Sequence, residues 1–175
     1  MDHNNRGTLR LVLEEGGPGV CTFAINNACN ARCGFCNFAL DKLPREDWVY
    51  VSRQGALDAL DILHAQGIRY LVITGGEPTM HPDLGRIVKR GSELDMKVML
   101  VTNGGLLRPE RIRDLVAAGI SSFIITIDAA TVESHERNRG LPGVCEKIRE
   151  ANRQLKELNI HTTASVTMRD RKSVV

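Results

Sequence analysis

The sequence predicts an α/β fold: about five parallel strands in an open arc, with helices outside. Two observations predict it. Short apolar runs alternate with segments in which apolar residues recur every three or four positions, the pattern of strands alternating with helices. The strand-like runs are apolar at nearly every position, as strands are when both faces of a parallel sheet are covered. Right-handed crossovers should connect the strands.

The first half of the chain supplies two strands and two helices. The β-rich run VCTFAIN (20–26) predicts the first strand, and 53–66 reads as a helix whose leucines recur every three residues. The near-continuous apolar run YLVIT (70–74) predicts the second strand and ends at a glycine pair. A second helix is expected from about Pro82, a residue suited to a first helical position.

The second half repeats the unit. KVMLVT (97–102), FIITI (123–127) and HTTASVT (161–167) predict strands, and 109–118 predicts a helix that ends at a glycine. The helix with the most regular pattern is 144–158, where apolar residues fall at i, i+4, i+7, i+11 and i+14. Each helix therefore follows a strand and precedes the next.

Five such units are too few for the eight-stranded barrel, so we expect a partial, TIM-like (β/α) barrel. Residues 1–19 are interpreted as an N-terminal extension, and 20–175 as one core domain that ends just after the fifth strand. An exposed edge strand is prone to pair with other chains. We therefore expect either a fragment of a longer protein or a domain completed by a partner.

Composition argues against several classes of protein. Hydrophobic residues make up 42% and charged residues 25%, as in soluble globular domains. The net charge is only +2, and acids and bases are interspersed, so there is no nucleic-acid signal. No apolar run is long enough for a membrane span, and the charged N-terminus does not resemble a secretory signal. Together with unpaired thiols, these features predict a cytoplasmic protein.

The most informative motif is CNARCGFC, in which Cys29, Cys33 and Cys36 are spaced C-x3-C-x2-C directly after the first strand. Three thiolates in one loop can meet at a single metal centre. Iron–sulfur cubanes are normally held by four cysteines, so three ligands suggest a cluster with one iron left open. A structural zinc site is the alternative, although it needs a fourth ligand. The remaining cysteines, Cys21 and Cys145, read as small buried hydrophobes.

Polar, glycine-rich segments follow the other strands as well. Gly75-Gly76-Glu77-Pro78 follows the second strand and Thr102-Asn103-Gly104 the third, while Thr126 and Asp128 lie at the end of the fourth. In parallel α/β sheets the loops at the carboxyl ends of strands share one rim. We therefore expect these segments and the cysteine loop to lie together.

These motifs resemble the radical S-adenosylmethionine (SAM) enzyme superfamily. CNARCGFC after a first strand and ITGGEP after a second match its pattern, and the resemblance covers roughly residues 20–167. It implies that Cys29, Cys33 and Cys36 hold a [4Fe-4S] cluster whose open iron binds the methionyl group of SAM. Reductive cleavage of SAM would give a 5′-deoxyadenosyl radical that abstracts hydrogen from a substrate. No catalytic residue is assigned beyond the cluster.

The same resemblance implies a set of SAM-binding residues. Glu77 and its glycines would bind the SAM amino group, although a simple turn would also explain the glycine pair. The stretch TIDAATVESHERNRG resembles the SxD…HDxxRG pattern of peptide-modifying and cofactor-maturing members. The residues predicted to bind SAM are Gly75, Gly76, Glu77, Phe35, Asn103, Thr126 and Arg139. The alternatives are a solvated polar loop around Arg139 and a hydrophobic anchor at Phe35. His81, His135 and Asp128 suggest general acid–base catalysis, but a radical mechanism needs no such group for bond cleavage, so we leave them outside the catalytic set.

The expected partners follow from the resemblance. They are SAM, an electron donor such as flavodoxin or ferredoxin, an unidentified substrate (a peptide or a small metabolite), and a C-terminal domain or partner chain. Relatives with this fourth-strand pattern often carry extra clusters in a cysteine-rich C-terminal domain, which this sequence lacks. Two alternatives therefore stay open: a non-catalytic domain that binds cluster and SAM for a partner, and a structural zinc-binding protein.

Overall fold

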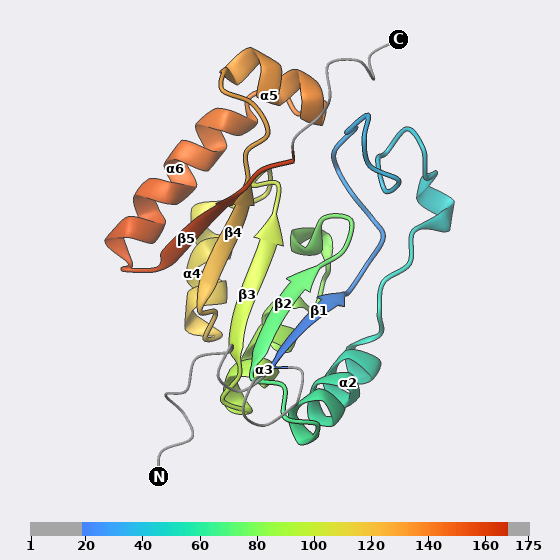
Figure 1. Cartoon of the computed structure of the whole chain (residues 1–175), viewed down its shortest axis with the longest axis vertical. Helices are drawn as coiled ribbons and strands as arrows, with labels where there is room; N and C mark the ends of the chain where they lie inside the picture. Colours follow the sequence, from blue (N-terminus) through green and yellow to red (C-terminus); the bar gives the residue numbers. More distant parts are fainter. Residues whose placement is uncertain (1–18, 168–175) are drawn as a thin grey trace.

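The computed structural model describes residues 19–167, and its centre is a sheet of five parallel strands. The strands lie in sequence order, β1-β2-β3-β4-β5, as Figure 1 shows. Their bounds are Val20–Ala24, Tyr70–Thr74, Lys97–Thr102, Ser122–Thr126 and His161–Ser165. The predicted open α/β sheet is confirmed. The predicted extension over residues 1–18 and the tail over 168–175 lie outside the described residues.

Helices follow the strands in the expected alternation. They are α2 (Arg53–Ala65), α3 (Leu84–Glu93), α4 (Pro109–Ala117), α5 (Val132–Arg139) and α6 (Val144–Glu157), with short 3-10 turns η2 (Arg45–Asp47) and η3 (Pro78–Met80). Ser52 caps α2 by accepting a hydrogen bond from the Gly55 amide. No helix within residues 19–167 is both long and apolar enough to cross a membrane.

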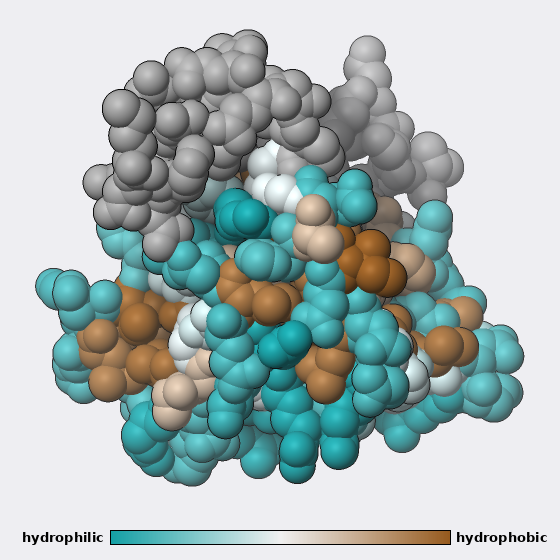
Figure 2. All heavy atoms as spheres, turned by 90° about the horizontal axis from the view of Figure 1, so that it is seen from below, coloured by the Kyte–Doolittle hydropathy of each residue, from teal (hydrophilic) through white to brown (hydrophobic). Residues whose placement is uncertain are grey.

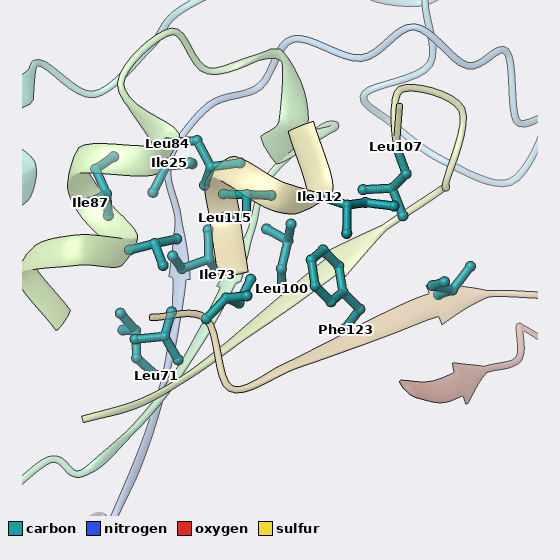
Figure 3. Close-up of a cluster of buried hydrophobic side chains, with 14 of the residues drawn as sticks. Ile25, Leu71, Ile73, Leu84, Ile87, Leu100, Leu107, Ile112, Leu115 and Phe123 are labelled. Atoms are coloured by element: carbon teal, nitrogen blue, oxygen red, sulfur yellow. The ribbon is translucent and has the colours of Figure 1, made fainter. Parts of the chain in front are cut away.

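The core lies between one face of the sheet and the helices. Alternate residues of the central strands are fully buried there, among them Leu71, Ile73, Leu100 and Phe123. Figure 3 shows these side chains pointing toward those of α3 and α4. The other face of β2, β3 and β4 is only half-buried. The sequence pattern predicted strands apolar on both faces, and the structure covers one of them fully.

Helix α5 was not predicted from the sequence, where a polar loop around Arg139 was considered as an alternative. Its buried residues are His135 and Arg139, so it has no apolar stripe. Its ends are nevertheless well defined. The Thr131 hydroxyl accepts a hydrogen bond from the Ser134 amide, and Gly140 ends the helix at a φ of 59°. Local capping and contacts with the cysteine loop therefore hold a helix that periodicity does not reveal.

Because every strand runs the same way, the loops that leave the strands gather at one end of the molecule (Figure 1). The opposite end is shown in Figure 2, where hydrophilic side chains of the described residues surround separate hydrophobic patches. At the sheet's edge, four of the five residues of β5 are exposed. All the chemistry-bearing motifs of the sequence thus belong to the first of these ends.

Candidate functional site

The cysteine loop, which follows β1 and contains CNARCGFC, brings its three thiols into one hydrophobic cluster. Cys29 and Cys33 are buried and Cys36 is half-buried, packed with Ala31 and Phe35. All five cysteines of the chain are free thiols. The predicted ligands therefore lie together, in an environment that excludes most water.

Each of these three sulfurs accepts an N–H hydrogen bond. The bonds are Ala31 N to Cys29 Sγ (3.4 Å), Phe38 N to Cys36 Sγ (3.4 Å) and Arg139 Nη1 to Cys33 Sγ (3.8 Å). Such donors stabilise negative charge on sulfur and tune a metal that the sulfur binds. The loop is therefore arranged to support thiolates.

Burial opposes that charge in the protein without metal. It raises the pKa of Cys29 to about 11, and the nearby charges of Glu77 and the other two thiols add to the effect. Burial also raises the pKa of Cys33, while the Arg139 guanidinium works in the opposite direction. These thiols are protonated at neutral pH, and binding a metal must release their protons.

The donor set fits an iron–sulfur cluster. Three thiols packed among apolar side chains are the soft ligands that such clusters require. Within residues 19–167, no three His, Cys, Asp or Glu side chains converge closely enough to hold a single metal ion. A cubane does not need such convergence, because each cysteine binds a different iron atom.

The glycine pair after β2 lies directly against the backbone of the cysteine loop. A Cβ on Gly76 would be 2.2 Å from the Ala28 carbonyl oxygen, a distance that no side chain tolerates. Two amide hydrogen bonds join the loops, from Gly76 to the Asn26 oxygen (2.9 Å) and from Glu77 to the Ala28 oxygen (2.7 Å). The glycines therefore permit the close approach of two rim loops, which a turn alone would not require.

The Glu77 carboxylate joins the loop after β2 to the loop after β3. It is 1% exposed and accepts hydrogen bonds from the Thr79 amide (3.1 Å) and hydroxyl (2.5 Å). It also accepts from the Thr102 hydroxyl (2.7 Å) and the Asn103 amide (2.8 Å). Burial raises the pKa of Glu77, and these donors lower it. Its predicted contact with the SAM amino group stays a prediction.

Asn103 and Thr126 complete the rim. The Asn103 side-chain amide donates to Asn30 Oδ1 of the cysteine loop at 2.8 Å, and the Asn103 Oδ1 accepts from the Gly105 amide. The Thr126 hydroxyl donates to the Thr102 carbonyl oxygen at 3.3 Å. The structure thus brings the predicted residues after β1, β2, β3 and β4 to one rim.

Arg139 reaches the cysteine loop from the end of α5. It is 8% exposed, forms an ion pair with Asp128, and its guanidinium carbon lies 5.4 Å from the centre of the Phe35 ring. Its carbonyl oxygen accepts a hydrogen bond from the Arg32 amide at 2.8 Å. The solvated polar loop considered for Arg139 is therefore wrong, because the residue is buried and paired.

Sequence reasoning did not include Asp128 in the site. The Asp128 side chain is 1% exposed, and its amide donates to His135 Nδ1 at 3.1 Å. Spacing gave no signal for the pair, because the helix that returns Arg139 to Asp128 was itself not predicted. His81 lies apart, with its ring nitrogens bonded to the Val51 carbonyl and the Asp83 amide.

The fold and this rim define a class of protein: a partial (β/α) barrel that holds three thiols beside a glycine-rich loop with a buried carboxylate. The sequence pattern described as the Radical SAM superfamily matches residues 23–170. The chain therefore belongs to the radical SAM superfamily.

Individual relatives have different activities. The AdoMet-dependent heme synthase of Methanosarcina barkeri is 30% identical over 138 residues, covering 78% of this chain and 39% of the relative. A GTP 3′,8-cyclase 1 of Mycobacterium tuberculosis is 29% identical over 126 residues, covering 66% of this chain and 33% of the cyclase. The chain thus spans well under half the length of these curated relatives.

Solved structures show the same fold. Streptococcus suis SuiB, bound to its precursor peptide SuiA, matches with a TM-score of 0.73 at 16% identity. The match covers 95% of this chain and 37% of SuiB. At this identity the similarity establishes the fold alone, and five parallel strands with outer helices agree with it.

Proposed function

We propose that the chain is the core of a radical SAM enzyme, in which Cys29, Cys33 and Cys36 bind three irons of a [4Fe-4S] cluster. One observation carries the proposal. The three cysteines pack in one hydrophobic cluster, where each sulfur accepts an N–H hydrogen bond and the glycine-rich loop lies against their backbone. Together with family membership, this donor set favours a cluster over the zinc alternative.

The remaining rim residues are proposed to bind SAM beside the cluster. They are Gly75, Gly76, Glu77, Phe35, Asn103, Thr126 and Arg139. Glu77 fixes the position of the glycine loop, since its carboxylate is engaged by Thr79 and Thr102. Bound together, the cluster and SAM supply reductive cleavage of a carbon–sulfur bond and hydrogen-atom abstraction from a substrate.

The substrate is proposed to be a peptide or a small metabolite. The relatives differ in this respect, since one is named a heme synthase, one a GTP cyclase, and SuiB is solved with a peptide. We further propose that flavodoxin or ferredoxin supplies electrons, that a C-terminal domain or partner chain covers the exposed β5 edge, and that the protein acts in the cytoplasm.

Anaerobic reconstitution tests the function. We expect the protein to bind iron and sulfide in equal amounts and, with dithionite, to release 5′-deoxyadenosine from SAM. Cys33→Ala should abolish the release, because one iron loses its ligand. Cys145→Ala is the matched control, because that thiol lies on α6 and is not part of the hydrophobic cluster around the other three cysteines. This variant should leave the release of 5′-deoxyadenosine unchanged.

The outcomes separate the three hypotheses. Zinc without iron, under strict anaerobiosis, would contradict the proposal and favour the structural zinc protein. A cluster that binds SAM but gives no 5′-deoxyadenosine would favour the non-catalytic domain that serves a partner.

A further inference from the structure

The three cysteine sulfurs have different kinds of hydrogen-bond donor. For Cys29 and Cys36 the donor is the backbone amide two residues further along the same loop. For Cys33 it is the guanidinium of Arg139, 106 residues away in sequence. Two thiols are therefore supported by neutral local donors, and the third by a full positive charge from another element.

Several contacts hold that guanidinium in place. It is paired with the buried carboxylate of Asp128 and lies over the Phe35 ring. The backbone of Arg139 is fixed as well, because its carbonyl oxygen accepts the Arg32 amide. Beyond it, Gly140 packs so tightly that a Cβ there would lie 2.7 Å from the Arg32 Cβ. The charge is thus anchored beside Cys33 at both its side chain and its backbone.

Both members of the ion pair act on Cys33, with opposite signs. The Arg139 guanidinium donates a hydrogen bond to the sulfur and carries positive charge, whereas the Asp128 carboxylate paired with it carries negative charge. Arg139 is the nearer of the two, since it donates directly to the sulfur. Water and salt screen such buried charges far less than surface charges.

We propose that Arg139 and Asp128 are positioning residues that set the reduction potential of the cluster from opposite directions through Cys33. The inference rests on the proposed cluster and is separate from any contact of Arg139 with SAM. Reduction adds one electron and hence one negative charge to the cluster and its thiolates. A donor with positive charge at a ligand sulfur stabilises that form, and a nearby carboxylate destabilises it.

The test is a redox titration of the anaerobically reconstituted protein without SAM, with dithionite as reductant and the EPR signal of the reduced cluster as readout. Arg139→Gln should shift the potential to more negative values, and Asp128→Asn to less negative values. The double variant should lie between wild type and Arg139→Gln, because the nearer charge has the larger effect. Arg137→Gln, the same change at an exposed position of α5, should leave the potential unchanged.

A purely structural role predicts a different pattern. Loosening of the loop would move the potential of both single variants in the same direction, and that result would overturn the inference, as would no shift in either. Arg139→Gln leaves Asp128 buried without its partner, which is destabilising. If Arg139→Gln fails to fold, the reduction potentials of Asp128→Asn and of the double variant must still lie on opposite sides of the wild-type value. A wild-type protein that binds no cluster refutes the proposed function instead.

Discussion

Helices α5 and α6 follow the same strand one after the other, yet they are held in different ways. Helix α6 has 14 residues and buries Val144, Ile148, Ala151 and Leu155 against the sheet. Helix α5 has 8 residues, and the side chains it buries are those of His135 and Arg139. One helix is therefore held by the hydrophobic core, and the other by capping, an ion pair and contacts with the cysteine loop.

The two helices are therefore stabilised by different kinds of contact within one βα unit. Apolar burial stabilises a helix with little dependence on exact orientation. Hydrogen bonds and ion pairs depend strongly on geometry. A helix that must place one guanidinium at one sulfur benefits from the second kind of contact. The comparison predicts that substitutions in α6 lower the free energy of unfolding of the whole domain. Substitutions in α5 should also disturb the contacts that position the cysteine loop.

The largest effect on stability is expected for Leu155→Ala in α6. Leu155 is fully buried, so the change removes core contacts and should lower the free energy of unfolding by about 2–5 kcal/mol. Chemical denaturation measures it. The cluster potential of the folded variant should match wild type, and a clear shift would show that α6 also supports the site.

Gly140→Ala should have the next largest effect. Gly140 has a φ of 59°, where a side chain costs about 1–2 kcal/mol, and the new Cβ would also press on Arg32. Gly143→Ala is the matched control, because Gly143 has a φ of 74° but a Cβ there would meet no other atom within 4 Å. Denaturation should show a loss in both, and iron bound per chain after reconstitution should fall only for Gly140→Ala. Equal iron contents would contradict the docking of α5 on the cysteine loop.

Much of this architecture is predictable from sequence, and α5 shows why part of it is not. Apolar spacing revealed α6, since the core selects apolar residues at helical intervals. The same rule cannot detect α5, whose buried residues are polar. Thr131 before the helix and Gly140 after it were the available signals, and both residue types are also common in loops.

The candidate site was likewise predicted only in part from the sequence. The cysteine loop and the glycine loop were predicted to share a rim because parallel strands bring their carboxyl ends together, and the structure does so. The partners of Glu77 and the pairing of Asp128 with Arg139 were not predicted. They depend on distances between loops, which the residue order along the chain does not specify.

Thr131→Ala should have a smaller effect, a loss of about 1 kcal/mol from the missing N-cap. Ser52→Ala removes the same kind of cap from α2 and should cost a similar amount. Thermal unfolding compares the two losses. Hydrogen exchange of the Arg32 amide should accelerate in Thr131→Ala alone, because that amide bonds to the end of α5. Acceleration in both variants would point to a global effect.

The smallest effect is expected for Arg137→Ala. This residue is exposed on α5 and donates to Ser134 at 3.3 Å, so the free energy of unfolding should change by no more than about 0.5 kcal/mol. The same denaturation assay applies. A loss comparable to that of Thr131→Ala would mean that surface contacts contribute to holding α5.

The cysteine loop also joins two distant parts of the sheet. Near its start it bonds to the loop after β2 through the Ala28 oxygen, and further along it bonds to the end of α5, beyond β4, through the Arg32 amide. The cysteine loop thus connects the segment after β2 with the end of α5. The relative positions of Cys29 and Cys33 therefore depend on contacts with segments that follow β2 and β4, two strands that do not pair with each other.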